Sequence, residues 1–518
     1  MVGREEQIIQ ERLKKLNEIR KLGIEPYPHK FEKKDNSNEI KATYSKLKED
    51  ERTKDSVKIA GRIMTVRDMG NLAFSTIQDG QGKIQIVLQK GETPEETMNI
   101  FSKLIDAGDF IGVEGTVFKT RRGEVSVLVK NIEILTKAIL PLPEKWHGIQ
   151  DKEERYRKRY LDLVMNPEVK NVFIVREKII DAIREYLKEK EFTEVDTPYL
   201  QAIYGGAEAK PFKTHLNALD MNLFLAISPE LYLKRLIVGG FEKVFTIARN
   251  FRNEGIDKWH NPEFTMMEIY ESYADYKDMM KLFEDIYEYV CKKVFGKTKL
   301  QFGEQEIEFK APWKRVRMAD CIKEHAKIDV EKMDEKELLE FCEENKVEIK
   351  EKSWGMLVCA LFEHFCEKNI IQPTFVIDHP CESTPLCKLH RESKYCNKFI
   401  ERFEPFCMGA ELGNAYSELN DPIRQKELLE SQQDKLKKGN EEANPYDEDF
   451  VNALEVGMPP TGGLGMGIDR MIMLLTNSPS IRDVILFPFM KPETKEVEAE
   501  IKKLDVAEKK VSKKEKKK

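Results

Sequence analysis

The chain has 518 residues, of which 41% are hydrophobic and 34% charged, and its net charge is −6. This length allows about two to four domains. No run of about 18 apolar residues occurs, so the sequence predicts no membrane span. The polar start MVGREEQIIQERLKK lacks the apolar core of a secretion signal. Nine cysteines, an odd number without a compact framework, indicate reduced thiols and a cytoplasmic protein.

The charge is distributed unevenly along the chain. Residues 501–518 contain nine lysines and three acidic residues, a local charge of +6, so the remaining residues carry −12. A basic tail on an acidic body is common in nucleic-acid binding, but it is also common as a plain solubilising tail. The composition of residues 493–518 predicts a basic, disordered tail.

The first elements are helical. Apolar residues at helical spacing predict a helix over 4–22, within an N-terminal helical segment of residues 1–50. Residues 51–137 then change to short strands at 57–66, 72–78, 83–88, 110–119 and 124–134, with one helix at 93–106. A helix between the third and fourth of five strands is the order of an OB barrel, a platform for single-stranded nucleic acid. Another small β-barrel would also fit.

A larger domain follows the predicted barrel. Residues 138–152 contain two prolines and a glycine and predict a linker. Residues 153–492 open with a periodic helix near 168–190 and then mix strands and helices, which indicates an α+β domain. Within it, the charged segment 278–370 is helix-rich and is a candidate helical insertion.

One group of polar residues lies between 251 and 268. Arg252 could hold a phosphate or carboxylate with its bidentate fork. Glu254, two residues on, would share its strand face and could accept a hydrogen bond from an exocyclic amine. Phe264, on a returning strand, could stack on a purine. A polar hairpin with a buried ion pair would explain the same residues.

A glycine-rich string, Gly463 to Gly467, precedes Arg470. Alternating glycines would let a ligand lie against a strand, since no side chain stands on one face. Arg470 could then stack on a base or pair with a terminal phosphate. The string is not a P-loop, because no Gly-Lys-Ser/Thr follows it.

Three glutamates, Glu404, Glu411 and Glu418, are spaced seven residues apart. On a strand, 404 and 418 share one face and 411 does not, so a turn must intervene if all three are to meet. Mg²⁺ prefers carboxylates together with phosphate oxygens. Plain surface charge would explain each glutamate taken singly.

Together and in this order, these motifs resemble those of the class II aminoacyl-tRNA synthetases. Four further strings resemble the lysyl-tRNA synthetases of that class: RYLDL at 159–163, SPELYLK at 228–234, RNFRNEG at 249–255 and IRDV at 481–484. The resemblance covers about residues 5–490. It implies an α+β fold in which a mostly antiparallel sheet with flanking helices follows an OB barrel. It also implies a homodimer, with residues 192–198 in the interface.

The resemblance implies ATP-dependent ligation of L-lysine to lysine tRNA through a lysyl-adenylate, with Mg²⁺ as cofactor. Arg252 and Arg470 would be catalytic, by positioning and charge neutralisation. The ATP site would comprise Arg252, Glu254, His260, Asn261, Phe264 and Arg470. The lysine site would comprise Gly206, Glu230, Arg252, Glu268, Tyr270, Asn414, Tyr416 and Glu418. Glu404 and Glu411 would hold the metal, and Arg67, Phe74, Gln85 and Glu124 would contact the anticodon.

The acidic residues of the implied lysine site favour lysine over other amino acids. Lysine brings two ammonium groups, and burying an ammonium without a partner is very costly. By the resemblance, Gly206 and Glu230 would hold the α-amine, and Tyr270 and Glu418 the ε-amine. Aspartate-charging relatives need cations there instead. Two alternative functions remain. One is a synthetase for aspartate or asparagine, and the other is a catalytically silent paralogue that only binds nucleic acid. Phe74 would alternatively be a barrel-core residue.

Two features depart from the family pattern. Residues 379–407 contain four cysteines and two histidines, and a Zn²⁺ site there is conceivable. However, the six- and nine-residue spacings between successive cysteines match no standard knuckle. The family's eukaryotic members often carry a Lys-rich N-terminal extension, whereas here the lysine run is C-terminal, which leaves its role open.

Overall fold

A computed structural model of the chain describes residues 3–143, 151–395 and 397–492. It contains two units, Met1–Gln150 and Asp151–Lys518, called here the barrel unit and the sheet unit. The predicted basic tail, Cys396 and residues 144–150 of the predicted linker lie outside the described residues.

The barrel unit begins with α1 (Arg4–Lys21) and α2 (Ser37–Thr43), as the predicted helical segment requires. Five strands follow, interrupted by α3 (Glu95–Leu104): β1 (Arg52–Asp68), β2 (Leu72–Gln78), β3 (Lys83–Gln89), β4 (Phe110–Lys119) and β5 (Val125–Thr136). They close into a barrel in the order β1-β2-β3-β5-β4. With the helix between the third and fourth strands, this order confirms the predicted OB fold.

Alternation of side chains builds the barrel core. Ile59, Ile63, Ile77, Ile86 and Val127 are among the buried residues that point inward. β1 starts five residues before its predicted beginning at 57. Its first residues belong to the strand because they pair with β4, but they are polar and mostly exposed. A hydrophobic pattern cannot reveal such a strand end.

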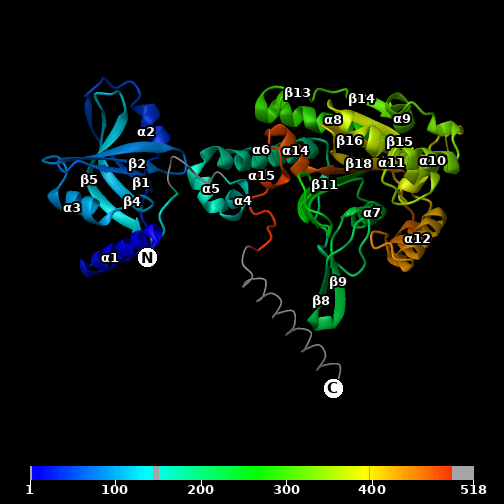
Figure 1. The fold of residues 1–518 in the computed structure, drawn as a ribbon, viewed down its shortest axis with the longest axis horizontal. Coiled ribbons are helices and arrows are strands. Elements are labelled where there is room, and N and C mark those ends of the chain that lie inside the picture. The colour runs from blue at the N-terminus through cyan, green and yellow to red at the C-terminus, as the bar shows by residue number, and fades with distance from the viewer. Residues whose placement is uncertain (1–2, 144–150, 396, 493–518) are drawn as a thin grey trace, which may run out of the picture. The chain divides into compact units, whose positions relative to one another are not determined.

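The sheet unit is built on a nine-stranded, mostly antiparallel sheet (Figure 1), which confirms the predicted α+β class. Its order is β14-β15-β16-β18-β19-β11-β10-β6, with β17 paired to β16. The strands are β6 (Thr193–Glu194), β10 (Lys243–Phe251), β11 (Glu263–Ser272), β14 (Lys314–Arg317), β15 (Thr374–Pro380), β16 (Phe399–Cys407), β17 (Ala410–Glu411), β18 (Gly413–Ser417) and β19 (Thr461–Gly467). Only the β14–β15 and β6–β10 pairs are parallel.

One face of this sheet packs on helices. α6 (Pro167–Glu189), α8 (Tyr276–Val290) and α14 (Ile468–Leu475) contribute to its main hydrophobic core. Sheet residues such as Met267, Leu464 and Ala415 point into the same core from adjacent strands. Because side chains alternate, residues 266, 268 and 270 of β11 point to the opposite face.

The predicted helical insertion over 278–370 is wrong in character and extent. α8 belongs to the main core, β12 (Lys299–Phe302) pairs with β13 (Gln305–Glu308), and β14 joins the large sheet. Only the stretch with α9 (Met318–Ala326), α10 (Glu335–Glu344) and α11 (Trp354–Phe365) forms a mainly helical cluster with a core shared with β15 and β16. Each of the short strands β12, β13 and β14 contains Lys, Arg or Glu, so their sequence resembles that of a charged helix.

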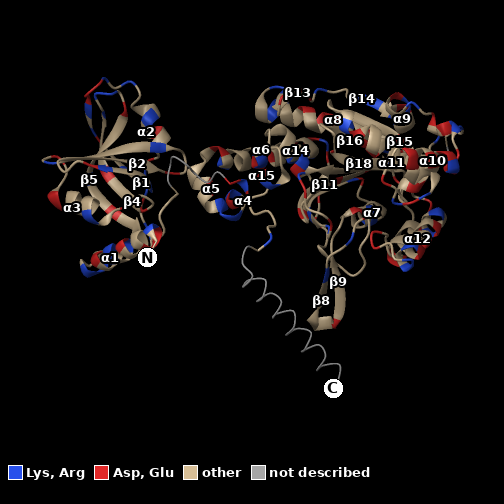
Figure 2. Ribbon diagram, viewed as in Figure 1, with Lys and Arg blue, Asp and Glu red and all other residues tan. Residues whose placement is uncertain are grey.

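The remaining elements lie outside the large sheet. They are α4 (Lys152–Arg157), α5 (Arg159–Met165), β7 (Leu200–Gln201), β8 (Lys213–Leu216), β9 (Met221–Leu225), α7 (Glu230–Val238), α12 (Pro422–Lys437), α13 (Glu448–Val456) and α15 (Ile481–Val484), with five short helical turns at 217–219, 291–295, 330–332, 367–369 and 381–383. Acidic and basic residues intermingle along α12 (Figure 2). Among the helices of the described residues, none has the length and apolar character needed to cross a membrane.

Candidate active site

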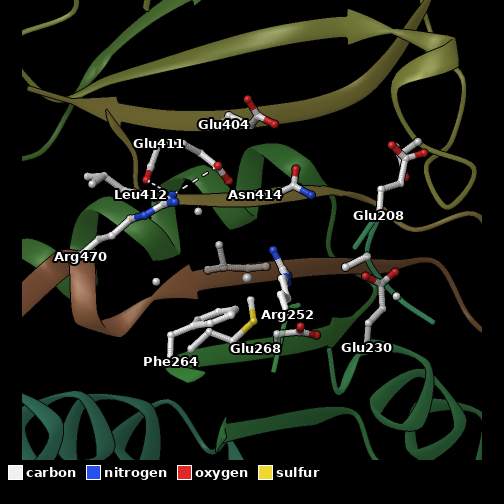
Figure 3. A pocket seen from close by; sticks show the side chains of 18 of the residues that line it. Glu208, Glu230, Arg252, Phe264, Glu268, Glu404, Glu411, Leu412, Asn414 and Arg470 are labelled. Atoms are coloured by element: carbon white, nitrogen blue, oxygen red, sulfur yellow. Dashed lines mark hydrogen bonds and ion pairs between the residues drawn. The ribbon is translucent and has the colours of Figure 1, made fainter. Parts of the chain in front are cut away.

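A cavity of about 330 Å³ lies on the second face of the sheet. Its lining includes every site residue predicted in the sheet unit, for ATP, lysine and metal alike. Arg470, Glu411 and Phe264 lie at one side, and Glu208 and Glu230 at the other, with Arg252 between them (Figure 3). We call the side with Arg470, His260, Phe264 and Glu411 the arginine end. The side with Glu230, Glu268 and Glu418 is the acidic end.

The floor of the cavity is the glycine-rich strand β19. Gly465 pairs with Glu268 of β11 on one side and with Asn414 of β18 on the other. Gly463 pairs in the same way with Tyr270 and Tyr416. A side chain at Gly463 would collide with the Glu418 carboxylate and the Tyr270 ring. The alternating glycines therefore make room for the functional groups that neighbouring strands supply.

Arg252 occupies the middle of the cavity, directly after β10. Its backbone N–H donates to the Pro262 carbonyl at 2.9 Å, and its guanidinium stands over the Phe264 ring at 5.1 Å. Burial lowers the pKa of Arg252, which nevertheless stays a cation at neutral pH. The predicted common strand face of Arg252 and Glu254 is wrong, because β10 ends at Phe251 and both residues follow it. Both still line the cavity.

At the arginine end, Arg470 lies in the first turn of α14. It donates to the Glu411 backbone carbonyl at 2.6 Å and approaches the Glu411 carboxylate at 3.4 Å. Its second nitrogen lies 3.0 Å from His260 Nε2. The start of α14 is fixed to β11, because the Thr265 N–H donates to Asp469 at 2.7 Å. This anchoring orients Arg470 toward the cavity.

The turn predicted between the spaced glutamates is present. Met408 and Gly409, both with positive φ, reverse the chain between β16 and β17. Glu404 and Glu411 thereby come to line one cavity from the two sides of the turn. Glu404 accepts from Arg402 at 2.5 Å, so each carboxylate has an arginine beside it.

The acidic end gathers three buried carboxylates from three separate parts of the chain. Glu268 accepts from Ser228 at 2.7 Å and from Tyr270 at 3.2 Å. Glu230, at the start of α7, accepts from the Tyr416 hydroxyl at 2.6 Å. Burial, and then the charge of Glu230, raise the pKa of Glu268 to about 8. Burial likewise raises the pKa of Glu418 well above its usual value.

Sequence reasoning missed the ammonium at this end. Lys234 Nζ lies 2.6 Å from Glu230 Oε1 and forms an ion pair with Glu418. A signal was available, since Lys234 follows Glu230 by four residues on one helix face. Arg402 was also missed, although it precedes Glu404 by two residues on the same strand face.

The four predicted anticodon residues lie together on the outside of the barrel. Phe74 is half-buried and pairs with Arg67 across β1 and β2, whereas its neighbours Ala73 and Ser75 point inward. Phe74 is not part of the barrel core, so the core alternative is wrong. Gln85 of β3 donates to the carboxylate of Glu124, which directly precedes β5, at 3.1 Å.

The histidines and cysteines of 379–407 have separate surroundings. His379 lies 3.1 Å from the Val376 carbonyl, and His390 lies 3.5 Å from Asp378. The thiols of Cys387 and Cys407 donate to different backbone carbonyls. Within the part of the chain that the structure describes, which leaves out Cys396, no three His, Cys, Asp or Glu side chains gather as metal ligands.

Comparison with known proteins agrees with this geometry. Residues 151–491 match the family of class II tRNA synthetases (D, K and N), and residues 57–135 match the OB-fold nucleic acid binding domain. The chain is 51% identical to a lysine–tRNA ligase of Pelotomaculum thermopropionicum, covering 95% of this chain and 96% of the relative. It is 49% identical to that of Bacillus subtilis, covering 93% and 97%. A third lysine–tRNA ligase, from Methanoculleus marisnigri, is 49% identical, covering 93% and 94%. The chain therefore belongs to the lysyl branch of the class II aminoacyl-tRNA synthetases.

Proposed function

We propose that the protein ligates L-lysine to lysine tRNA at the expense of ATP. The lysine carboxylate attacks the α-phosphorus of ATP to give lysyl-adenylate and pyrophosphate, and the lysyl group then moves to the terminal adenosine of the tRNA. The observation that carries this proposal is the acidic end, where three buried carboxylates face a cavity that also holds Arg252. A substrate with two ammonium groups and one carboxylate matches that arrangement.

The acidic end would bind the amines. Glu230, with the backbone of Gly206, is assigned to the α-ammonium, and Glu418 with Tyr270 to the ε-ammonium. Glu268 and Asn414 lie beside them on the adjoining strands. Tyr416, which is 4% exposed, would pack along the alkyl stem of the substrate. Because these groups are already held by neighbouring side chains, little ordering would remain to be done on binding.

The arginine end would bind the nucleotide. Arg252 is assigned to the α-phosphate and the lysine carboxylate, which its central place allows it to reach together. Phe264 and Arg470 would sandwich the adenine, since both an aromatic ring and a planar guanidinium stack on a base. Glu254 and Asn261 would contact the adenine edge, with His260 near the phosphates. Catalysis would then come from positioning and from neutralising the charge that develops on the phosphate.

Glu404 and Glu411 are suited to Mg²⁺. Their carboxylate oxygens are the hard donors that this ion prefers, and two protein carboxylates leave room for phosphate oxygens and water. The ion, when bound with ATP, would neutralise phosphate charge and favour departure of pyrophosphate. Arg470 and Arg402 would hold the two carboxylates in place.

The barrel unit is assigned to the anticodon. Phe74 offers a ring on which an unstacked base can stack, and Gln85, Glu124 and Arg67 offer polar groups for base edges. We further propose a homodimer and a cytoplasmic site of action. Tyr199 and Leu200, which directly follow residues 192–198, are about half exposed and apolar, as interface residues of a dimer would be. The eight described cysteines are free, as expected in a reducing compartment.

The decisive experiment is ATP–pyrophosphate exchange with each of the twenty amino acids offered singly. Exchange that depends on lysine, followed by charging of lysine tRNA, is the expected result. Exchange driven by aspartate or asparagine would identify the wrong branch of the family. No exchange with any amino acid would identify a protein that binds nucleic acid without activating a substrate.

A further inference from the structure

The side chain of Lys234 is enclosed completely beneath the acidic end. It is 0% exposed, and its ammonium contacts Glu230 of its own helix and Glu418, which follows β18. The rings of Tyr416 and Phe450 lie 5.5 and 5.8 Å from Nζ. Burial alone would lower the pKa of Lys234, but the charges of Glu230 and Glu418 outweigh it and raise that pKa. The residue is therefore a permanent buried cation.

Lys234 does not line the cavity, whereas Glu230, Glu268 and Glu418 do. A bound substrate would therefore meet the acids and not the lysine behind them. Burying a charge pair usually stabilises a fold less than apolar residues of similar volume would. A buried ammonium at this place consequently calls for an explanation other than stability.

The balance of charges at the acidic end explains why an ammonium is buried there. The two ammonium groups of a bound lysine would favour the ionised form of all three acids. Three carboxylates and one ammonium then leave two negative charges, and the two ammonium groups of one lysine would balance them. The substrate carboxylate would be balanced separately by Arg252. Glu208, a further acid of the lining, is exposed, and Arg402 is already paired with Glu404. Without Lys234, the buried set would carry one negative charge more than the substrate can neutralise.

Lys234 also orients the two acids. Glu230 Oε1 is occupied by Lys234 at 2.6 Å and by the Tyr416 hydroxyl at 2.6 Å, which leaves Oε2 for a ligand. Glu418 Oε2 faces Lys234, and within the described part of the chain Oε1 accepts no hydrogen bond although it is buried. Each acid thus has one oxygen held by Lys234 and one oxygen that Lys234 does not contact.

We propose that Lys234 is a positioning residue that sets the charge of the acidic end to match the two ammonium groups of lysine, and so contributes to substrate specificity. This inference rests on the proposed function. Its test uses Lys234→Met, Glu418→Gln, the double variant and wild type. Arg235→Met is the matched control, since Arg235 lies on the same helix and pairs with Asp447 outside the cavity.

The measurement is lysine-dependent ATP–pyrophosphate exchange, with KM for lysine and for ATP determined between pH 6.5 and 8.5. In Lys234→Met we expect KM for lysine to rise about tenfold or more while KM for ATP stays unchanged. The pH profile of KM for lysine should move to higher pH, because the acids lose their counter-ion. The double variant should be no worse than Glu418→Gln alone, since removing both charges restores the net charge of the wild-type acidic end. Arg235→Met should leave KM for lysine at its wild-type value.

Three results would overturn the inference. One is an unchanged KM for lysine in Lys234→Met. Another is a parallel loss for lysine and ATP, with additive effects in the double variant, which would make Lys234 merely structural. If Lys234→Met does not fold, the double variant still should, because it returns the buried set to the two negative charges of wild type. A double variant that also fails to fold would be the third such result. Wild type that shows no lysine-dependent exchange would instead refute the proposed function itself.

Discussion

At the acidic end of the cavity Glu268 is 3% exposed and Glu418 is 0% exposed, whereas at the arginine end Glu254 and His260 face solvent. The acids are held by Lys234, Ser228 and two tyrosines before any substrate arrives. The arginine end has fewer such ties, and its charges would find partners on the nucleotide and its metal. The difference indicates that amino-acid selection depends on groups arranged during folding, while nucleotide binding depends on partners that come with the ligand.

The strongest way to break this comparison is Arg252→Ala, because Arg252 lies between the two ends. The negative charge that develops on the phosphate would lose the guanidinium that neutralises it, and the lysine carboxylate would lose its positively charged partner. Loss of a donor of this kind typically costs about 10²–10³ in rate. Lysine-dependent pyrophosphate exchange measures it, and near-normal exchange would refute the assignment of Arg252.

A paired substitution separates the ends. Glu418→Gln keeps the shape of the acidic end but removes one charge, and we expect KM for lysine to rise about 100-fold with little change in KM for ATP. Glu411→Gln should instead raise KM for ATP and the Mg²⁺ concentration that the reaction requires, with little change in KM for lysine. Equal weakening of both substrates in Glu418→Gln would show that Glu418 is structural.

A substitution in the barrel unit should alter neither end. Phe74→Ala removes a stacking face worth about 1–3 kcal/mol per base, so kcat/KM for lysine tRNA should fall about tenfold. Pyrophosphate exchange should be unchanged, since it requires no tRNA. Phe110→Ala, which removes another half-buried ring, from β4, is the matched control. If Phe74→Ala kept the wild-type preference for the lysine anticodon, the assigned face of the barrel would be wrong.

The smallest expected effect is a pH dependence confined to the acidic end. With a pKa of about 8, the Glu268 carboxyl is mostly protonated at pH 7 and half ionised at pH 8, and only the ionised form attracts an ammonium. KM for lysine should therefore fall about fivefold as the pH rises from 7 to 8, while KM for ATP does not. Glu268→Gln should abolish the slope. A slope that survives this change would belong to another group.

Sequence reasoning succeeded where local pattern determines the outcome. Strict alternation gave β2 and β4 their observed bounds, and the glycine spacing of β19 revealed a cavity floor. It failed where polar residues form strands, as at the start of β1 and in β12 and β13, because those segments lack an apolar period. The partners of Glu418 could not be deduced, since Lys234 is 184 residues away in the chain and only the fold brings the two together.

The place of β19 in the chain has a consequence for synthesis. This strand lies between β11 and β18 at the centre of the sheet, yet of the strands in the described residues it is the last to be made. The barrel has all its core residues by position 134, so it can fold early on the ribosome, whereas the large sheet stays in two separate parts until residues 461–467 emerge. Closing the sheet joins segments far apart in sequence, which makes it an intrinsically slow step. A chain that stops before β19 would lack both the cavity floor and Arg470, so activity should appear only near the completion of translation.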